Sequence, residues 1–181
     1  MSAVWPPRFE RYGITLQPIT EADLEMVRLW RNSPEISQHM LDQRPISQAQ
    51  QQAWFAGLCG DEQRAYWVAS FKGEPIGVAS LVAIDRERRQ CEPSMYIYPQ
   101  HYRNNIVPFC VAFALNDMAF FELGMGLLVG KVFRENVASL RFHLKCGYQA
   151  QDDHHGELIP MTLRVVDYQA ARDPLARFIR Y

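Results

Sequence analysis

The sequence of 181 residues lacks the cysteine spacing of a disulfide framework or a zinc site. Its four cysteines, Cys59, Cys91, Cys110 and Cys146, lie far apart and form no Cys-x-x-Cys pair. Disulfide scaffolds need many pairs in a short chain, and structural zinc sites need closely spaced ligands. We therefore expect reduced thiols, no metal site and a cytoplasmic protein.

Basic excess, the residue pattern of a secretory signal and a long apolar run are also missing from the sequence. The 19 Lys and Arg residues are balanced by 20 Asp and Glu residues, so there is no surplus charge to displace counterions from nucleic acid. Residues 1–7 lack the basic and apolar regions of a secretory signal. The longest apolar stretch, 107–121, is interrupted by Asn116 and Asp117 and is too short to cross a bilayer. We expect small-molecule or local protein partners, without nucleic acid or membrane.

The chain does contain the elements of one α/β (α+β) domain. Its length suits a single well-buried core, and no linker divides residues 1–181. We expect a short N-terminal arm at 1–12 and a C-terminal tail at 170–181. Hydrophobic patterning predicts helices at 20–32, 47–58, 107–121 and from 136, and strands at 13–19, 65–71, 74–83, 92–98, 127–133, 148–153 and 158–168.

Local signals fix several boundaries. Ser47 and Gln50 form a capping-box pattern at the start of the second helix. Lys72-Gly73 is typical of a hairpin turn between two strands. Asn136 is a good helix N-cap, and Gly147 suits the left-handed residue that follows a helix.

The order of elements between Glu92 and Tyr148 resembles the acyl-CoA core of the GNAT superfamily of N-acetyltransferases. The resemblance rests on a strand at 92–98, a loop at 103–108, two helices, and the pattern Asn136, Ser139, Phe142, Gly147 and Tyr148. It implies a mixed, mostly antiparallel sheet of about seven strands flanked by about four helices. It also implies acetyl-CoA as acyl donor and a small-molecule amine as acceptor, and it allows a homodimer.

The resemblance assigns donor-binding residues. The main chain of the strand would lie along the pantetheine arm, the loop before the third helix would hold the phosphates, and the helix led by Asn136 would meet the pantetheine and adenine. A helix N-terminus suits this role because its unpaired N–H groups attract anions. The residues implied are Met95, Tyr96, Ile97, Arg103, Asn104, Asn105, Ile106, Val107, Asn136 and Ser139.

The phosphate loop departs from the family pattern. The family reads Arg/Gln-x-x-Gly-x-Gly/Ala, which places Ile106 and Pro108 on the two small positions. A β-branched residue resists positive φ, and proline lacks an N–H donor. We expect an altered anion site that has lost one phosphate contact. The alternative is a GNAT-shaped binding module that no longer holds CoA.

Two residues are candidates for proton transfer in a direct transfer mechanism. Glu92 is placed to accept a proton from the acceptor amine through water, with Glu135 as second choice. The family often has a tyrosine acid after the aromatic residue of the last helix, and His143 stands there in this chain. Each residue also has a plain interpretation, as a solvated charge or a solvent-facing helix histidine.

The N-terminal pattern suggests an acceptor. The run from Leu29 to Ile36, followed by Met40, resembles amino-sugar N-acetyltransferases of the pseudaminic acid pathway, which act on the 4-amine of a UDP-linked sugar. The resemblance makes Arg31 and Met40 substrate-binding residues, although a histidine of those enzymes corresponds to Gln51 here. Arg31 at a helix end could instead cap carbonyls. A protein N-terminal (ribosomal-protein type) or small-amine acetyltransferase is the alternative enzyme.

Overall fold

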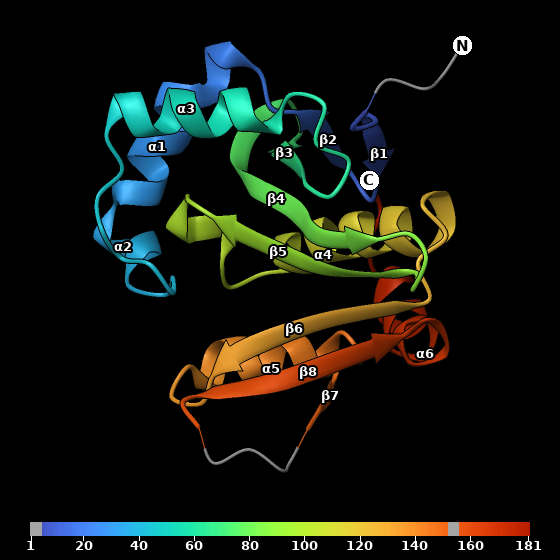
Figure 1. Ribbon diagram of the computed structural model, residues 1–181. Helices are drawn as coiled ribbons and strands as arrows, with labels where there is room; N and C mark the ends of the chain where they lie inside the picture. Colours follow the sequence, from blue (N-terminus) through green and yellow to red (C-terminus); the bar gives the residue numbers. More distant parts are fainter. Residues whose placement is uncertain (1–4, 152–155) are drawn as a thin grey trace.

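The computed structural model describes residues 5–151 and 156–181, which form one mixed sheet with helices on both faces (Figure 1). The strand order is β1-β2-β3-β4-β5-β6-β8-β7, and every neighbouring pair is antiparallel except β5 with β6. This confirms the expected mixed, mostly antiparallel sheet. The strands are β1 (Phe9–Arg11), β2 (Ile14–Pro18), β3 (Ala65–Phe71), β4 (Glu74–Asp85), β5 (Gln90–Ile97), β6 (Leu127–Phe133), β7 (Gln149–Ala150) and β8 (Leu158–Arg164).

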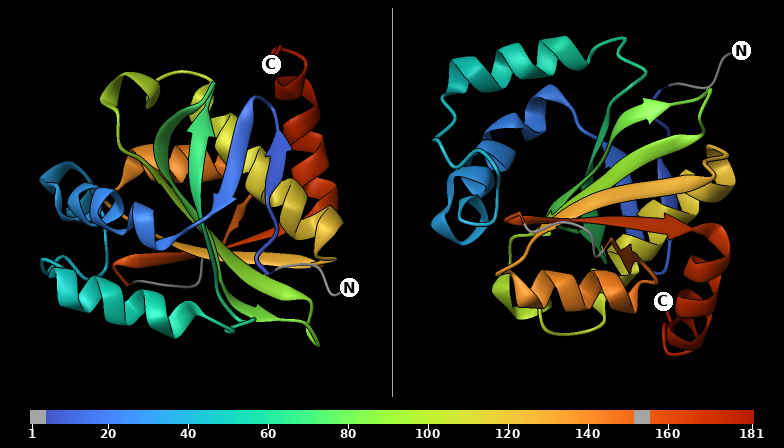
Figure 2. Two further views of the ribbon diagram at one scale, coloured as in Figure 1. Left: turned by 90° about the horizontal axis from the view of Figure 1, so that it is seen from above. Right: turned by 60° about the horizontal axis from the view of Figure 1, so that its bottom comes forward.

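Six α-helices within the described residues cover the two faces of the sheet (Figure 2). Val27 and Trp30 of α1 pack on Val68 and Val78 of the sheet, so α1 covers one face. Helix α4 packs its apolar residues into the larger core on the other face. The helices are α1 (Leu24–Asn32), α2 (Pro34–Ser37), α3 (Gln48–Leu58), α4 (Val107–Asp117), α5 (Val137–Lys145) and α6 (Val165–Ala176).

The local sequence signals are found in the structure. Ser47 and Gln50 make both bonds of a capping box at α3. The Asn136 side chain accepts a hydrogen bond from the Ser139 amide at 3.1 Å. Lys72 and Gly73 both have positive φ, as a type I′ hairpin turn requires, and Gly147 has φ of 98°.

Two expectations about elements need correction, and a third lies partly outside the described residues. The N-terminal arm contributes an edge strand, β1, because residues 9–11 pair with β2. The strand expected at 158–168 ends at Arg164, and α6 begins at Val165. The β-branched pair Val165-Val166 favoured a strand in the sequence, but packing decides otherwise: Tyr168 is fully buried and its hydroxyl donates to the Phe113 carbonyl at 3.0 Å. The hairpin turn expected at 155–156 lies partly outside the described residues.

Strands β5 and β6 pair only at their first residues. Gln90 pairs with Leu127 and Cys91 with Leu128, and no further pair joins the two strands among the residues described. Beyond Cys91, β5 continues to pair with β4 as far as Ile97. The edge of β5 that faces β6 is therefore open from Glu92 onward (Figure 1).

No helix in the described ranges, 5–151 and 156–181, has the length and apolar character to cross a membrane. The same residues contain no group of three or more His, Cys, Asp or Glu side chains arranged to hold a metal ion.

Candidate active site

Two cavities meet along β5. The first, the inter-strand cleft, has a volume of about 550 Å³ and lies where β5 and β6 separate. The second, the α3 cavity, has a volume of about 680 Å³ and lies between the sheet and the helices α1 and α3. Both cavities are lined by Met40, Glu92, Ser94, Met95 and Tyr96. The two cavities therefore adjoin at β5.

Most of the expected donor-binding residues line the inter-strand cleft. They come from β5, from the loop before α4 and from the start of α5, which lie far apart in the sequence. The residues in the cleft wall are Met95, Tyr96, Ile97, Arg103, Asn104, Asn136 and Ser139. Asn105, Ile106 and Val107 are not part of the described lining.

The loop before α4 presents free amides despite its altered sequence. Ile106 has φ of −74°, an ordinary right-handed value, so its β-branched side chain is unstrained there. That side chain packs against the core rather than lining the cleft, while Pro108 occupies the first turn of α4, where proline is well tolerated. None of the described hydrogen bonds uses the amides of Asn104, Asn105 or Ile106. The Val107 amide is occupied, because it donates to the Asn105 side chain at 2.9 Å.

Arg103 is held by the end of β5. Its Nε donates to the Ile97 carbonyl at 2.8 Å, and one terminal nitrogen donates to the Tyr98 carbonyl. The same terminal nitrogen forms an ion pair with Glu35 at 3.0 Å. The guanidinium therefore stays at the mouth of the cleft with its charge balanced by a carboxylate from α2.

His143 lines the inter-strand cleft as a neutral ring. Its Nδ1 lies 2.8 Å from the Ser139 carbonyl, which can only accept, so Nδ1 carries the proton. Burial lowers the pKa of His143, and the bond to Ser139 opposes this only in part. The ring is thus uncharged at pH 7, with Nε2 as an acceptor. The plain interpretation of a solvent-facing histidine is wrong, since the side chain is half-buried.

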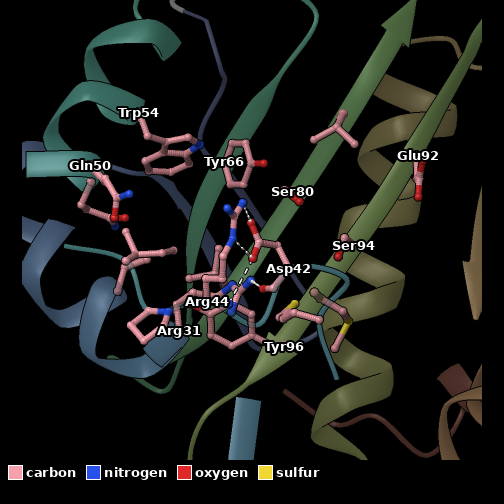
Figure 3. A pocket seen from close by; sticks show the side chains of 18 residues that line it. Arg31, Asp42, Arg44, Gln50, Trp54, Tyr66, Ser80, Glu92, Ser94 and Tyr96 are labelled. Carbon is pink, nitrogen blue, oxygen red and sulfur yellow. Dashed lines mark hydrogen bonds and ion pairs between the residues drawn. The ribbon is translucent and has the colours of Figure 1, made fainter. Parts of the chain in front are cut away.

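The α3 cavity is lined by a row of polar residues on one face of β4 and β5 (Figure 3). Glu92 and Ser94 alternate along β5, and Ser80 of β4 pairs directly with Ser94. Alternate residues of a strand point to the same face, so these three side chains face the cavity together. Glu92 also lines the inter-strand cleft, whereas Glu135, the second candidate base, is exposed and absent from the described lining of both cavities.

The opposite wall of the α3 cavity is aromatic and charged. Trp54 of α3 meets Tyr66 of β3 edge to face, with ring centres 4.8 Å apart. Arg44 and Asp42 form an ion pair at 2.6 Å, and this pair strongly lowers the pKa of Asp42. Because the pair is neutral overall, Arg31 and Glu92 supply the unpaired charges of this cavity.

Two buried polar atoms in this cavity have no hydrogen-bond partner. They are Nη1 of Arg31 and the hydroxyl of Tyr96, the two such side-chain atoms among residues 5–151 and 156–181. The other terminal nitrogen of Arg31, Nη2, donates to the Asp42 carbonyl, so the guanidinium is fixed in place. A buried donor without a partner costs about 1–3 kcal/mol, and a ligand that accepts from it recovers this cost.

A family model described as the acetyltransferase (GNAT) domain matches residues 14–149. The chain belongs to the GNAT acetyltransferase family. It is therefore an acyltransferase.

Individual relatives support the GNAT assignment. The uncharacterized N-acetyltransferase YoaA of Bacillus subtilis (strain 168) is 26% identical over 150 residues, covering 80% of this chain and 84% of YoaA. The fold is similar to that of a spermidine N-acetyltransferase from Vibrio cholerae solved with CoA and spermine, with a TM-score of 0.76 at 18% identity over 87% of this chain and 99% of that one. The N-acetyltransferase PseH of Campylobacter jejuni has a TM-score of 0.66 at 17% identity, covering 84% and 98%.

Some lining residues of this GNAT protein escaped the sequence analysis. Asp42 and Arg44 lie in the segment 34–45, which lacks periodicity; the resemblance placed this segment at the acceptor site but gave neither residue a role. Ser94 and the Tyr96 side chain carried a usable signal, because they alternate with Glu92 on one strand face. Gln51, at the position of a histidine in the amino-sugar enzymes, is buried in the cavity wall and donates to the Leu24 carbonyl at 3.3 Å.

Proposed function

We propose that this GNAT enzyme transfers an acetyl group from acetyl-CoA to the primary amine of a small molecule that also carries an anionic group. An amino sugar linked to a nucleotide is our first candidate. The inter-strand cleft would hold the donor and the α3 cavity the acceptor. The observation that carries this proposal is that the two cavities share residues of β5.

The chain offers groups for each stage of the reaction. The open edge of β5 provides main chain along which the pantetheine arm can lie, and the free amides before α4 suit its phosphates. Asn136 and Ser139 at the start of α5 would meet the other side of the donor. Donor binding therefore needs none of the missing loop glycines.

Glu92 is the group best placed to receive the proton of the acceptor amine. An alkylammonium has a pKa near 10 and cannot attack until it loses a proton, so a carboxylate, directly or through a water, assists. The amine nitrogen then bonds to the thioester carbonyl carbon, the carbon–sulfur bond breaks and the sulfur leaves as thiolate. His143 is neutral, and its Nδ1 proton is already donated to the Ser139 carbonyl. His143 is therefore a poorer acid than its position in the sequence suggested.

The unpartnered atoms in the α3 cavity favour an anionic acceptor over a polyamine. Arg31 Nη1 and the Tyr96 hydroxyl are both donors without a partner, and a phosphate or carboxylate oxygen is an acceptor for such donors. A polyamine brings only positive charge and N–H donors, which Arg31 repels. The similarity to a spermine-bound acetyltransferase fold keeps small amines as the second candidate acceptor class.

A panel of acceptors separates these classes. Release of the CoA thiol would be followed with amino-sugar nucleotides, peptides and polyamines offered in parallel. We expect turnover with the anionic amines. In Tyr96→Phe, the KM for these amines should be about tenfold higher, which corresponds to about 1.4 kcal/mol for one hydrogen bond. The KM for acetyl-CoA should be unchanged.

Tyr98→Phe is the matched control for that variant. Tyr98 follows the same strand but stacks on Trp30 and lies outside the described lining of both cavities. A preference for polyamines, or equal effects of the two tyrosine variants, would contradict the anionic acceptor. If acetyl-CoA gave no stabilisation of the wild-type protein in a melting assay, the donor assignment itself would fail.

A further inference from the structure

The segment that follows α1 lies along the mouth of the inter-strand cleft. We call residues 34–40 the α2 strap; it comprises α2 and the turn after it. Glu35, Ile36, His39 and Met40 of the strap all line the cleft. The strap emerges from α1, and the chain beyond it continues through Asp42 and Arg44, which line the α3 cavity. One continuous stretch of chain thus borders both cavities.

Two contacts tie the strap to opposite walls of the cleft. Glu35 Oε2 lies 3.0 Å from a terminal nitrogen of Arg103, in the loop before α4. Nδ1 of His39 lies 3.5 Å from Nδ2 of Asn136, the N-cap of α5. Arg103 and Asn136 come from the two elements that our proposed function assigns to the donor. The strap therefore holds the same residues that the donor needs.

The ion pair between Glu35 and Arg103 is of a kind that a phosphate can displace. The Glu35 side chain is 58% exposed, and an exposed ion pair contributes little because water screens it. Phosphate groups form charge-assisted, often bidentate bonds with a guanidinium, and the pyrophosphate of the donor presents two of them against the single carboxylate of Glu35. Arg103 itself would stay in place, because the Ile97 and Tyr98 carbonyls hold it independently of Glu35.

We propose that Glu35 competes with the phosphates of the donor for Arg103, so that donor binding removes one of the two contacts that tie the α2 strap to the cleft. Loss of that contact lets the strap adjust at Met40, which lines both cavities, while buried Ile36 keeps α2 in place. The consequence is coupling: a bound donor changes the affinity of the α3 cavity for the acceptor. This inference rests on the proposed function, since it requires CoA to occupy the inter-strand cleft.

Calorimetric titration of CoA into Glu35→Gln tests the competition. The variant keeps the size of the side chain and removes the charge. Because the side chain is exposed, we expect the variant to fold as wild type does. We expect CoA to bind roughly two- to fivefold more tightly than to wild type at low ionic strength, because the competing carboxylate is gone. The difference should shrink at high ionic strength, because salt screens exposed pairs.

Glu87→Gln is the matched control, since Glu87 is an exposed residue of the β4–β5 turn outside the described lining of the cleft. This variant should bind CoA as wild type does. Unchanged or weaker binding to Glu35→Gln would overturn the competition. A wild-type protein that does not bind CoA at all would instead refute the proposed function.

The coupling has its own measurement. The affinity for an accepted amine would be determined with and without saturating CoA, in wild type and in Glu35→Gln. We expect CoA to change acceptor affinity in wild type and to change it less in the variant, because the contact between Glu35 and Arg103 is already absent. Equal coupling in both proteins would show that Glu35 does not link the two cavities.

Discussion

Glu92 and His143 both line the inter-strand cleft, but their surroundings differ. Glu92 lies on β5 where the two cavities join, so its carboxylate can meet an amine in one and a thioester in the other. His143 is bonded to the Ser139 carbonyl and loses its charge through burial. The sequence made Glu92 the candidate base and His143 the candidate acid; the environment in the structure favours the first role and weakens the second.

Replacing Glu92 with Gln should therefore affect chemistry more than binding. We expect kcat to fall about a hundredfold to ten-thousandfold, the usual range for a general base, with the KM for acetyl-CoA little changed. Thiol release under saturating substrates measures it, and Glu87→Gln serves as the charge-matched control. A Glu92→Gln enzyme with normal kcat would show that the proton leaves by another route.

At the scale of elements, β4 and β5 approach each other so closely that only glycine fits at one position. Gly77 pairs with Ile97, and a Cβ on Gly77 would lie 2.0 Å from the Tyr96 carbonyl oxygen. That contact is far below any tolerated distance and its partner is main chain, which cannot rotate away. Gly77 therefore sets the path of β5 along both cavities.

We expect Gly77→Ala to push β5 outward, lowering the melting temperature and weakening acetyl-CoA binding together. Gly57→Ala is the matched control, because Gly57 lies in α3 and a Cβ there would have its nearest neighbour atom at 3.7 Å. Alanine at this position should leave the stability unchanged or raise it by up to about 1 kcal/mol. Thermal melts with and without acetyl-CoA compare the two. Equal behaviour of both variants would mean that β5 can shift without cost.

Elements with local causes were predictable, and those with tertiary causes were not. The capping box of α3, the Lys72-Gly73 turn and the Asn136 cap depend on residues within a few positions, so the sequence reveals them. Helix α6 depends on buried contacts of Tyr168 with α4, which no local pattern shows. The site divides in the same way: the family resemblance placed Glu92 and Asn136, whereas the ion pair of Asp42 and Arg44 depends on how a segment without periodicity folds against the sheet.

At the scale of the whole molecule, one buried carboxylate joins both ends of the chain to the core. Asp117, at the end of α4, is fully buried and accepts hydrogen bonds from Arg11 at 3.0 Å, Tyr12 at 2.6 Å, Tyr168 at 2.5 Å and Arg172 at 2.9 Å. Burial and the neighbouring charge of Asp117 raise the pKa of both tyrosines, so they remain proton donors across the physiological range. In the sequence, Asp117 only interrupts an apolar run; in the fold it holds the N-terminal hairpin and α6 against α4.

Asp117→Asn should consequently destabilise the entire domain. The amide keeps the shape of the side chain but removes the negative charge that compensates Arg172, whose side chain is 17% exposed. Losing one partner of a buried ion pair lowers the free energy of unfolding by about 3–5 kcal/mol. In a domain of this size that corresponds to a melting temperature lower by roughly 6–20 °C. Asp173→Asn is the control, because Asp173 bonds the same Arg172 but is 60% exposed, so we expect less than about 1 kcal/mol. Denaturant unfolding of both variants gives the comparison.

Asp117 lies outside the described lining of both cavities, so the folded Asp117→Asn variant should keep its KM values. A selective loss of activity without loss of stability would contradict a purely structural role.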